Sequence, residues 1–170
     1  DPSVILSADK ILFPGVGEAS SAMDYLNKRG LDKVILDAKQ PFLGICLGMQ
    51  LMGVHAGCPL IQHLHDLKPD ADRHRFDNEH LVESEFGSGK VASWHHQALA
   101  DCGPFEPIGW SDDGVLEAIR DTKKPFHLGV QCHPERTESS PADLERVWAA
   151  FVQAAARTPG GRSEEHTSEL

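Results

Sequence analysis

The side chains best suited to covalent chemistry in this sequence are Cys46 and His133. Cys46 stands between Gly44 and Gly48 in the segment Gly-Ile-Cys-Leu-Gly, which follows an apolar run and precedes residues with helical spacing. Small neighbours allow a strained strand-to-helix turn that presents one side chain, and a helix N-terminus favours thiolate over thiol. The next amide, of Leu47, would point to where an oxyanion forms. The pattern predicts a nucleophilic cysteine; a buried, unreactive one is the alternative.

His133 offers the base that a nucleophilic thiol requires. It follows the strand-like run 128–131 and begins the tripeptide His-Pro-Glu, which ends at Glu135. An imidazole activates a thiol, and a carboxylate sets the imidazole's tautomer and stabilises its cation. Pro134 fixes its own φ and biases His133 towards extended geometry, which would hold the flanking side chains in a set relation. The sequence therefore predicts a Cys46–His133–Glu135 triad.

The elements before Cys46 alternate between strands and helices. The expected order is a strand over 8–13, a Pro-Gly-Val-Gly loop over 14–17, a helix over 18–29, a helical stretch over 31–38 and a strand from Phe42. We expect the first helix to stop at Gly30. This alternation is typical of a parallel α/β sheet, whose ligands bind at the carboxyl ends of the strands. The 14–17 loop and Cys46 would both lie at that edge.

The elements after residue 53 are less regular. Residues 112–114, Asp-Asp-Gly, are expected to form a hairpin turn between strands around Ile108 and over 115–119. A closing helix is expected over 143–156. The charged stretch 69–83 lacks an apolar period and is expected to be an exposed loop.

Composition and charge exclude several classes of function. The chain has 170 residues, 16 basic against 26 acidic, for a formal net charge of −10. No basic block interleaves with aromatics, so a nucleic-acid partner is not expected, and no apolar run suits a membrane span. The four cysteines form no C-x-x-C pair, which favours reduced thiols and a cytoplasmic location.

The ten histidines raise the question of a metal site. The candidates are His63, His65, His74, His80, His95 and His96. His63 and His65 would share one face of a strand. Without cysteines or carboxylates at recognisable spacing, however, these histidines are expected to be solvated loop residues, and no metal or cofactor is expected.

Two motifs together carry a family resemblance. Gly-Ile-Cys-Leu-Gly-Met-Gln over 44–50, followed by Gly-Val-Gln-x-His-Pro-Glu over 129–135, resembles the class I glutamine amidotransferase superfamily. The resemblance implies an α/β fold, a flavodoxin-like, mostly parallel sheet flanked by helices. It implies Cys46 as nucleophile, His133 as general base and acid, and Glu135 as the partner that orients His133.

The resemblance also implies further site residues. It places Gln50 beside the substrate, and the amides near Val16, Gly17 and Leu47 at an oxyanion hole. Residues 7–52 resemble the glutaminase subunit of imidazole glycerol phosphate synthase, whereas residues 54–157 resemble the γ-glutamyl-γ-aminobutyrate hydrolase group. The segment His95, His96 and Gln97 belongs to the second resemblance and is expected to line the substrate pocket.

Three functions are therefore weighed. The first is a cysteine-dependent hydrolase that cleaves a small-molecule γ-glutamyl amide through a thioester, most like the γ-glutamyl-γ-aminobutyrate hydrolases. The second is the glutaminase subunit of imidazole glycerol phosphate synthase, which supplies ammonia to a cyclase subunit in histidine biosynthesis. The third is an inactive truncated or chimeric fragment.

The expected organisation is one domain over residues 1–157 that lacks its N-terminal strand and helix. The change of resemblance near residue 53 is consistent with a join between two genes or with a natural intermediate family member. Residues 158–170 are expected to form a disordered tail. Within it, residues 162–170 resemble a translated sequencing adapter rather than a protein segment.

Overall fold

Seven strands form one mixed sheet in the computed structural model, which describes residues 1–76, 78–135 and 141–157 (backbone only at 36 and 141–145). Their order across the sheet is β1-β2-β9-β8-β7-β4-β5. The strands are β1 (Ile11–Phe13), β2 (Phe42–Ile45), β4 (Asn78–Ser84), β5 (Gly87–Ser93), β7 (Glu106–Ser111), β8 (Leu116–Arg120) and β9 (His127–Val130). Two short strands, β3 (Leu60–Ile61) and β6 (Ala98–Leu99), pair separately.

Strand direction explains how the sheet can be mixed and still mostly parallel. β1, β2 and β9 pair in parallel, while β9–β8, β8–β7, β7–β4 and β4–β5 pair antiparallel. Following these pairings, β1, β2, β9, β7 and β5 run one way, which is five of the seven strands. The central motif strands, β2 and β9, are in register, with Gly44 opposite Gly129. Cys46 therefore leaves the sheet at the same edge as the segment that follows Val130.

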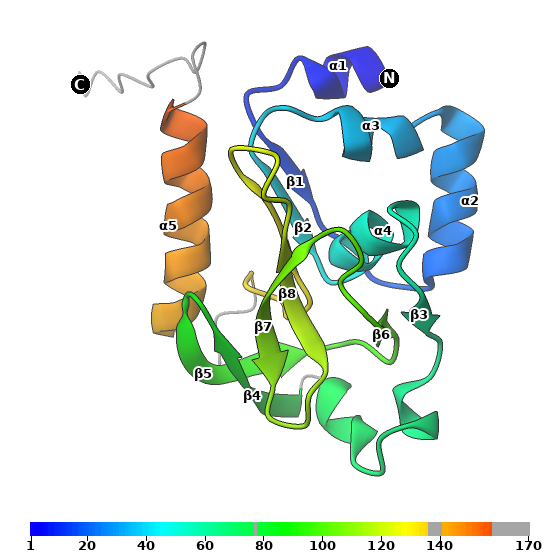
Figure 1. The fold of residues 1–170 in the computed structure, drawn as a ribbon, viewed down its shortest axis with the longest axis vertical. Helices are drawn as coiled ribbons and strands as arrows, with labels where there is room; N and C mark the ends of the chain where they lie inside the picture. The colour runs from blue at the N-terminus through cyan, green and yellow to red at the C-terminus, as the bar shows by residue number, and fades with distance from the viewer. Residues whose placement is uncertain (77, 136–140, 158–170) are drawn as a thin grey trace, which may run out of the picture.

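Helices cover both faces of the sheet (Figure 1). On one side lie α2 (Ala19–Arg29), α3 (Asp32–Asp37) and α4 (Leu47–His55), with α1 (Pro2–Leu6) beside α3. On the other side lies α5 (Pro141–Arg157). Two 3-10 helices, η1 (Leu64–Asp66) and η2 (Ala71–His74), precede β4. The predicted α/β class is confirmed, and no helix in the described part of the chain is long and apolar enough to cross a membrane.

Side-chain alternation in the strands builds a hydrophobic core on each face. In β2, Leu43 and Ile45 point to the α5 side, where Phe151 packs against the sheet. Phe42 points the other way, into a core with Leu51 and the helices α2 to α4. A strand buried on both faces must be apolar throughout, which is why β2 appears in the sequence as a continuous apolar run.

Several predicted elements are confirmed at their boundaries. The helix expected over 18–29 is α2, and Gly30 ends it at φ 64°, in the left-handed region. The helical stretch expected over 31–38 is the separate helix α3. The hairpin expected at 112–114 joins β7 to β8, with Gly114 at φ 84°.

The prediction for residues 69–83 is wrong. This stretch contains η2 and most of β4, and His74, His80 and Val82 in it are buried. The inward positions of β4 do alternate, but one of them carries histidine in place of an apolar residue. An apolar period is therefore invisible in the sequence although the strand has a buried face.

We predict that His127 makes the fold acid-sensitive. Its ring packs against Phe42, with centroids 4.4 Å apart, and burial, then the charge of Lys124, lowers its pKa from 6.5 to about 4. Between these values the unfolded chain binds a proton that the folded chain excludes, so stability falls as pH drops through this window. The expected loss between pH 7 and about 4.5 is about 2 to 3 kcal/mol. Urea unfolding measures it.

The matched variant for this prediction is His127→Gln, which keeps a polar side chain that does not titrate. Its unfolding free energy should fall less than that of the unsubstituted protein over the same pH range. Equal losses in the two proteins would show that other groups cause the acid sensitivity.

Candidate active site

Cys46 occupies a strained turn between β2 and α4. Its backbone has φ 51° and ψ −107°, an arrangement that non-glycine residues rarely adopt. The turn is held on both sides, because the Cys46 amide donates to Val130 O at 2.8 Å and Cys46 O accepts from the Gln50 amide at 3.1 Å. The predicted strand-to-helix turn is present, and its strain falls on the cysteine itself.

The two flanking glycines serve close packing and not a left-handed conformation. A Cβ at Gly48 would lie 1.9 Å from the carbonyl oxygen of Phe13 in β1. A Cβ at Gly44 would lie 2.8 Å from Met52 Sδ and 2.9 Å from the carbonyl carbon of Gly48. Neither glycine has a positive φ. They let α4 approach β1 and β2 closely. This close approach fixes where Cys46, the residue immediately before the helix, lies in space.

The Cys46 thiol is almost fully buried, with 3% of the residue exposed. Gln131 Nε2 donates to its Sγ at 3.5 Å, and Sγ lies 3.9 Å from the Trp94 carbonyl oxygen. Burial raises the thiol's pKa to about 12; the Leu47 amide lowers it less, and the negative charge of Glu117 raises it further. The expected preference for thiolate is therefore wrong for this conformation, because desolvation outweighs the helix N-terminus.

His133 and Glu135 form the predicted pair. His133 is 3% exposed, and its Nδ1 lies 2.7 Å from Glu135 Oε1, so the ring donates from Nδ1 to the carboxylate. Its Nε2 is buried and has no hydrogen-bond partner among the described residues, Cys46 Sγ included. Nε2 is thus the ring nitrogen left for contact with the thiol or a substrate. The pair is assembled, whereas the hydrogen bond from thiol to imidazole is not formed.

The loop at 14–17 lies beside Cys46. Val16 and Gly17 line the same cavity as the cysteine, and Gly17 has φ 121°. The Leu47 amide, however, donates to Gly15 O at 3.3 Å. The three predicted oxyanion residues are therefore neighbours, but the Leu47 N–H is occupied by a backbone carbonyl.

A cavity of ≈ 330 Å³ opens next to the thiol. Its lining includes all four residues expected to bind substrate, and consists of Val16, Gly17, Cys46, Gln50, Trp94, His95, His96 and Gln97. Some of their polar groups already have partners within the protein. Gln50 Nε2 donates to Gln97 O at 2.9 Å and to Gln131 Oε1 at 3.1 Å, while Gln97 Oε1 accepts from the Ala19 amide at 3.3 Å. These amides fix the cavity wall against α2 and α4.

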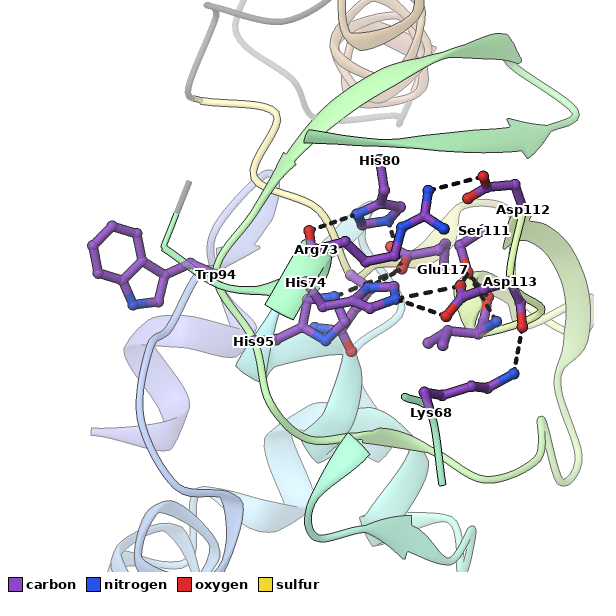
Figure 2. Close-up of polar contacts among 12 residues, drawn as sticks. Lys68, Arg73, His74, His80, Trp94, His95, Ser111, Asp112, Asp113 and Glu117 are labelled. Atoms are coloured by element: carbon purple, nitrogen blue, oxygen red, sulfur yellow. Dashed lines mark hydrogen bonds and ion pairs between the residues drawn. The ribbon is translucent and has the colours of Figure 1, made fainter. Parts of the chain in front are cut away.

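A buried polar cluster next to this wall was not predicted from the sequence. His74, His80 and His95 surround Glu117, and all four are buried (Figure 2). The expectation of solvated histidines is correct for His63 and His65 but wrong for these three. The signal that could have found the cluster is the single acid in the apolar run Val-Leu-Glu-Ala-Ile over 115–119, since a lone buried carboxylate needs partners.

The cluster is connected, through Glu117 in β8, to Gln131 beside the Cys46 thiol. Burial raises the pKa of Glu117, but the hydrogen bond from His80 and the interaction with His95 outweigh it and hold this pKa at about 2. Glu117 is therefore ionised at neutral pH. Its carbonyl oxygen accepts from the Gln131 amide at 2.7 Å, so β8 couples the cluster to the residue that bonds Cys46 Sγ.

Comparison with known proteins agrees with the geometry. The family model for "Glutamine amidotransferase class-I" matches residues 5–153. This chain belongs to the class I glutamine amidotransferase family, and its fold is the flavodoxin-like α/β fold of that family.

Two HisH subunits are similar to this chain, over stretches of very different length. The chain is 35% identical over 159 residues to the imidazole glycerol phosphate synthase subunit HisH of Mannheimia succiniciproducens, covering 85% of this chain and 81% of that subunit. It is 54% identical over 56 residues to the HisH subunit of Bacteroides thetaiotaomicron, where the match covers 33% of this chain and only 29% of the relative.

Among solved structures, a Thermoplasma acidophilum protein described as a putative GMP synthase subunit superposes with a TM-score of 0.73. The match covers 92% of this chain and 77% of that one at 18% identity. At this identity the likeness establishes the fold alone.

We predict that Gly48→Ala destabilises the protein severely. The new methyl group would meet the Phe13 carbonyl oxygen, so α4 must move away from β1, at a cost of about 3 kcal/mol or more. Urea unfolding of the variant measures this loss.

The control is Gly53→Ala in the same helix. The atoms nearest to its methyl group would be Leu99 side-chain atoms, with both terminal carbons at 2.5 Å and Cγ at 3.1 Å, and not backbone as at Gly48, while alanine favours a helix over glycine by about 1 kcal/mol. The control should therefore lose clearly less stability. Similar losses at the two positions would refute the close contact between α4 and β1.

Proposed function

We propose that this chain hydrolyses the γ-amide of glutamine or of a γ-glutamyl amine through a thioester on Cys46. The observation that carries the proposal is the strained Cys46 turn at the carboxyl end of β2, which lies beside a cavity and occurs together with a buried His133 paired to Glu135. A strained, non-glycine residue at such a turn is typical of a functional position. The family to which the chain belongs supports the same chemistry.

The proposed roles follow from what each group can accept or donate. The Cys46 thiol gives its proton to His133 Nε2, and its sulfur forms a bond to the γ-carbonyl carbon of the substrate. Glu135 accepts from Nδ1 and stabilises the imidazolium. The C–N bond then breaks as His133 returns the proton to the leaving amine. Water, deprotonated by His133, cleaves the thioester and releases glutamate.

The resting conformation supports a site that must be activated. The thiol is protonated, His133 Nε2 is unpartnered, and the Leu47 amide is bound to Gly15 O. For Leu47 to stabilise an oxyanion, its N–H must leave Gly15 O, so the 14–17 loop must change conformation. Val16 and Gly17, which line the cavity, are the proposed second source of oxyanion donors.

The first candidate for the whole protein is an ammonia-supplying glutaminase subunit with a cyclase partner. It is favoured by the Mannheimia HisH relative, whose match extends through both halves of the chain. An inactive resting site also suits this role, because a partner can then switch it on. Glutamine would be the substrate, and Gln50, His96 and Gln97 are proposed to line its binding site.

The second candidate is a self-sufficient γ-glutamyl amide hydrolase, as in the γ-glutamyl-γ-aminobutyrate hydrolase group. The observation that favours it is the position of His95, His96 and Gln97 along the wall of the cavity that holds Cys46. This cavity of ≈ 330 Å³ has room for a leaving amine larger than ammonia.

We predict that a γ-glutamyl diazoketone alkylates Cys46 selectively. Mass spectrometry of the trapped protein should place the adduct on Cys46, and Cys46→Ser and His133→Ala should each abolish it. Cys58→Ser is the matched control, because it removes another buried cysteine outside the cavity and should leave labelling unchanged.

Absence of labelling in a protein that melts cooperatively would reject the enzyme proposal. Absence of both labelling and a cooperative melt would instead support the inactive-fragment alternative.

We predict that ammonia release from glutamine depends on a cyclase subunit of imidazole glycerol phosphate synthase. Adding the subunit should raise the rate of glutamate formation, because the resting site must change conformation near Gly15 before it can stabilise an oxyanion. Glutamate formation, followed with and without the subunit, measures this effect, and Cys46→Ser sets the background. Full activity of the chain alone, with γ-glutamyl amines preferred over glutamine, would select the second candidate.

A further inference from the structure

Three histidines that are distant in the sequence meet at one buried carboxylate (Figure 2). His74 ends η2, His80 lies in β4, His95 follows β5, and Glu117 lies in β8. Their exposed fractions are 0%, 1%, 4% and 1%. His95 also lines the cavity beside Cys46, but the proposed hydrolysis assigns no role to His74, His80 or Glu117, so the composition of the cluster requires a separate explanation.

The outer ring nitrogens of two of these histidines must carry their protons. His74 Nε2 lies 3.2 Å and 3.3 Å from the two carboxylate oxygens of Asp113, and His95 Nδ1 lies 3.0 Å from Gln97 O. A carboxylate and a carbonyl can only accept, so both nitrogens donate. Asp113 is held in place in turn by the Ser111 hydroxyl and by Lys68, whose Nζ donates to the Asp113 carbonyl.

The inner ring nitrogens of His74 and His95 therefore carry lone pairs when the rings are neutral. His74 Nδ1 and His95 Nε2 each lie 3.6 Å from Glu117 Oε1, and neither has a hydrogen-bond partner among the described residues. Glu117 Oε2 is likewise buried and unpartnered within the described part of the chain. Two lone pairs and a carboxylate thus face one another, which is repulsive unless a positive charge lies between them.

His80 supplies part of the positive environment but does not resolve this contact. Its Nε2 lies 3.1 Å from Glu117 Oε1 and its Nδ1 lies 3.4 Å from Arg73 O. His80 can therefore donate to the carboxylate from outside. A proton added to His74 or His95 would give an ion pair with Glu117, but at 3.6 Å the nitrogen lies too far from the oxygen for a hydrogen bond.

A metal ion fits the distances and the donor set. Tetrahedral zinc with bonds of about 2.0 to 2.1 Å places its ligands about 3.4 Å apart. The two separations of 3.6 Å are close to that value, and the ligand atoms of His74, His95 and Glu117 all lie within 4.8 Å of one another. Histidine ligands also usually donate their other nitrogen to a carboxylate or carbonyl, as His74 and His95 do here.

We propose that His74 Nδ1, His95 Nε2 and the Glu117 carboxylate bind one divalent transition-metal cation, and that zinc is the ion this donor set favours. The ion joins η2, the segment after β5, and β8. Because Gln97 O accepts from both His95 Nδ1 and Gln50 Nε2, the ion also stiffens the cavity wall without contacting Cys46. The proposed role of the ion is structural. The proposal of this metal site does not depend on whether the proposed hydrolysis is correct.

The test is zinc binding by the full chain. The protein is first stripped of metal with a chelator, and zinc is then added back. The unsubstituted protein should retain one zinc per chain through gel filtration, measured by elemental analysis, and zinc should raise its melting temperature. Glu117→Gln preserves the shape of the side chain but removes its charge, and it should lose the zinc. His63→Gln, at an exposed histidine outside the cluster, is the matched control and should retain it.

Cobalt in place of zinc identifies the ligands even if Glu117→Gln fails to fold. The unsubstituted protein should show the d–d absorption of tetrahedral nitrogen and oxygen ligands, without a thiolate charge-transfer band. A thiolate band would assign the metal to cysteines and overturn the proposal. Failure of the unsubstituted protein to retain zinc would overturn it too, as would equal retention by Glu117→Gln.

Discussion

The approach of helix α4 to strand β1 is the contact on which the site depends. The Gly48 backbone lies so close to the Phe13 carbonyl that no side chain fits between them, and this fixes the start of α4 against the sheet. Since Cys46 is the residue between β2 and α4, its strained backbone is imposed by that contact and by the hydrogen bond to Val130 O. The thiol is thus positioned by close backbone packing together with backbone hydrogen bonds.

Burial then sets the chemical state of the site. The packing that positions Cys46 also excludes water from it, and the thiol is consequently protonated and the Leu47 amide satisfied within the chain. In the proposed hydrolysis, such a site would need a change near Gly15 before the Leu47 amide could stabilise an oxyanion.

Much of the site could be predicted from the sequence because its signals are local. Cys46 with its glycines, and His133 with Glu135, are recognisable over a few residues, and Gly30 and the hairpin at 112–114 have turn chemistry that depends on neighbours in the chain. The cluster around Glu117 could not be predicted, because its four residues come from three elements and the segment after β5, and they meet only after folding. The thiol's protonation was also missed, since desolvation depends on what covers Cys46 and not on the sequence around it.

The pairing of β2 with β9 has a consequence for how the chain is made. Gly44 meets Gly129, so the sheet around Cys46 cannot close until the chain has been synthesised through β9. Until then Cys46 has neither its hydrogen-bond acceptor at Val130 nor the burial that raises its thiol's pKa. The chemical state of this sulfur is therefore set by a segment that lies more than eighty residues further along the chain.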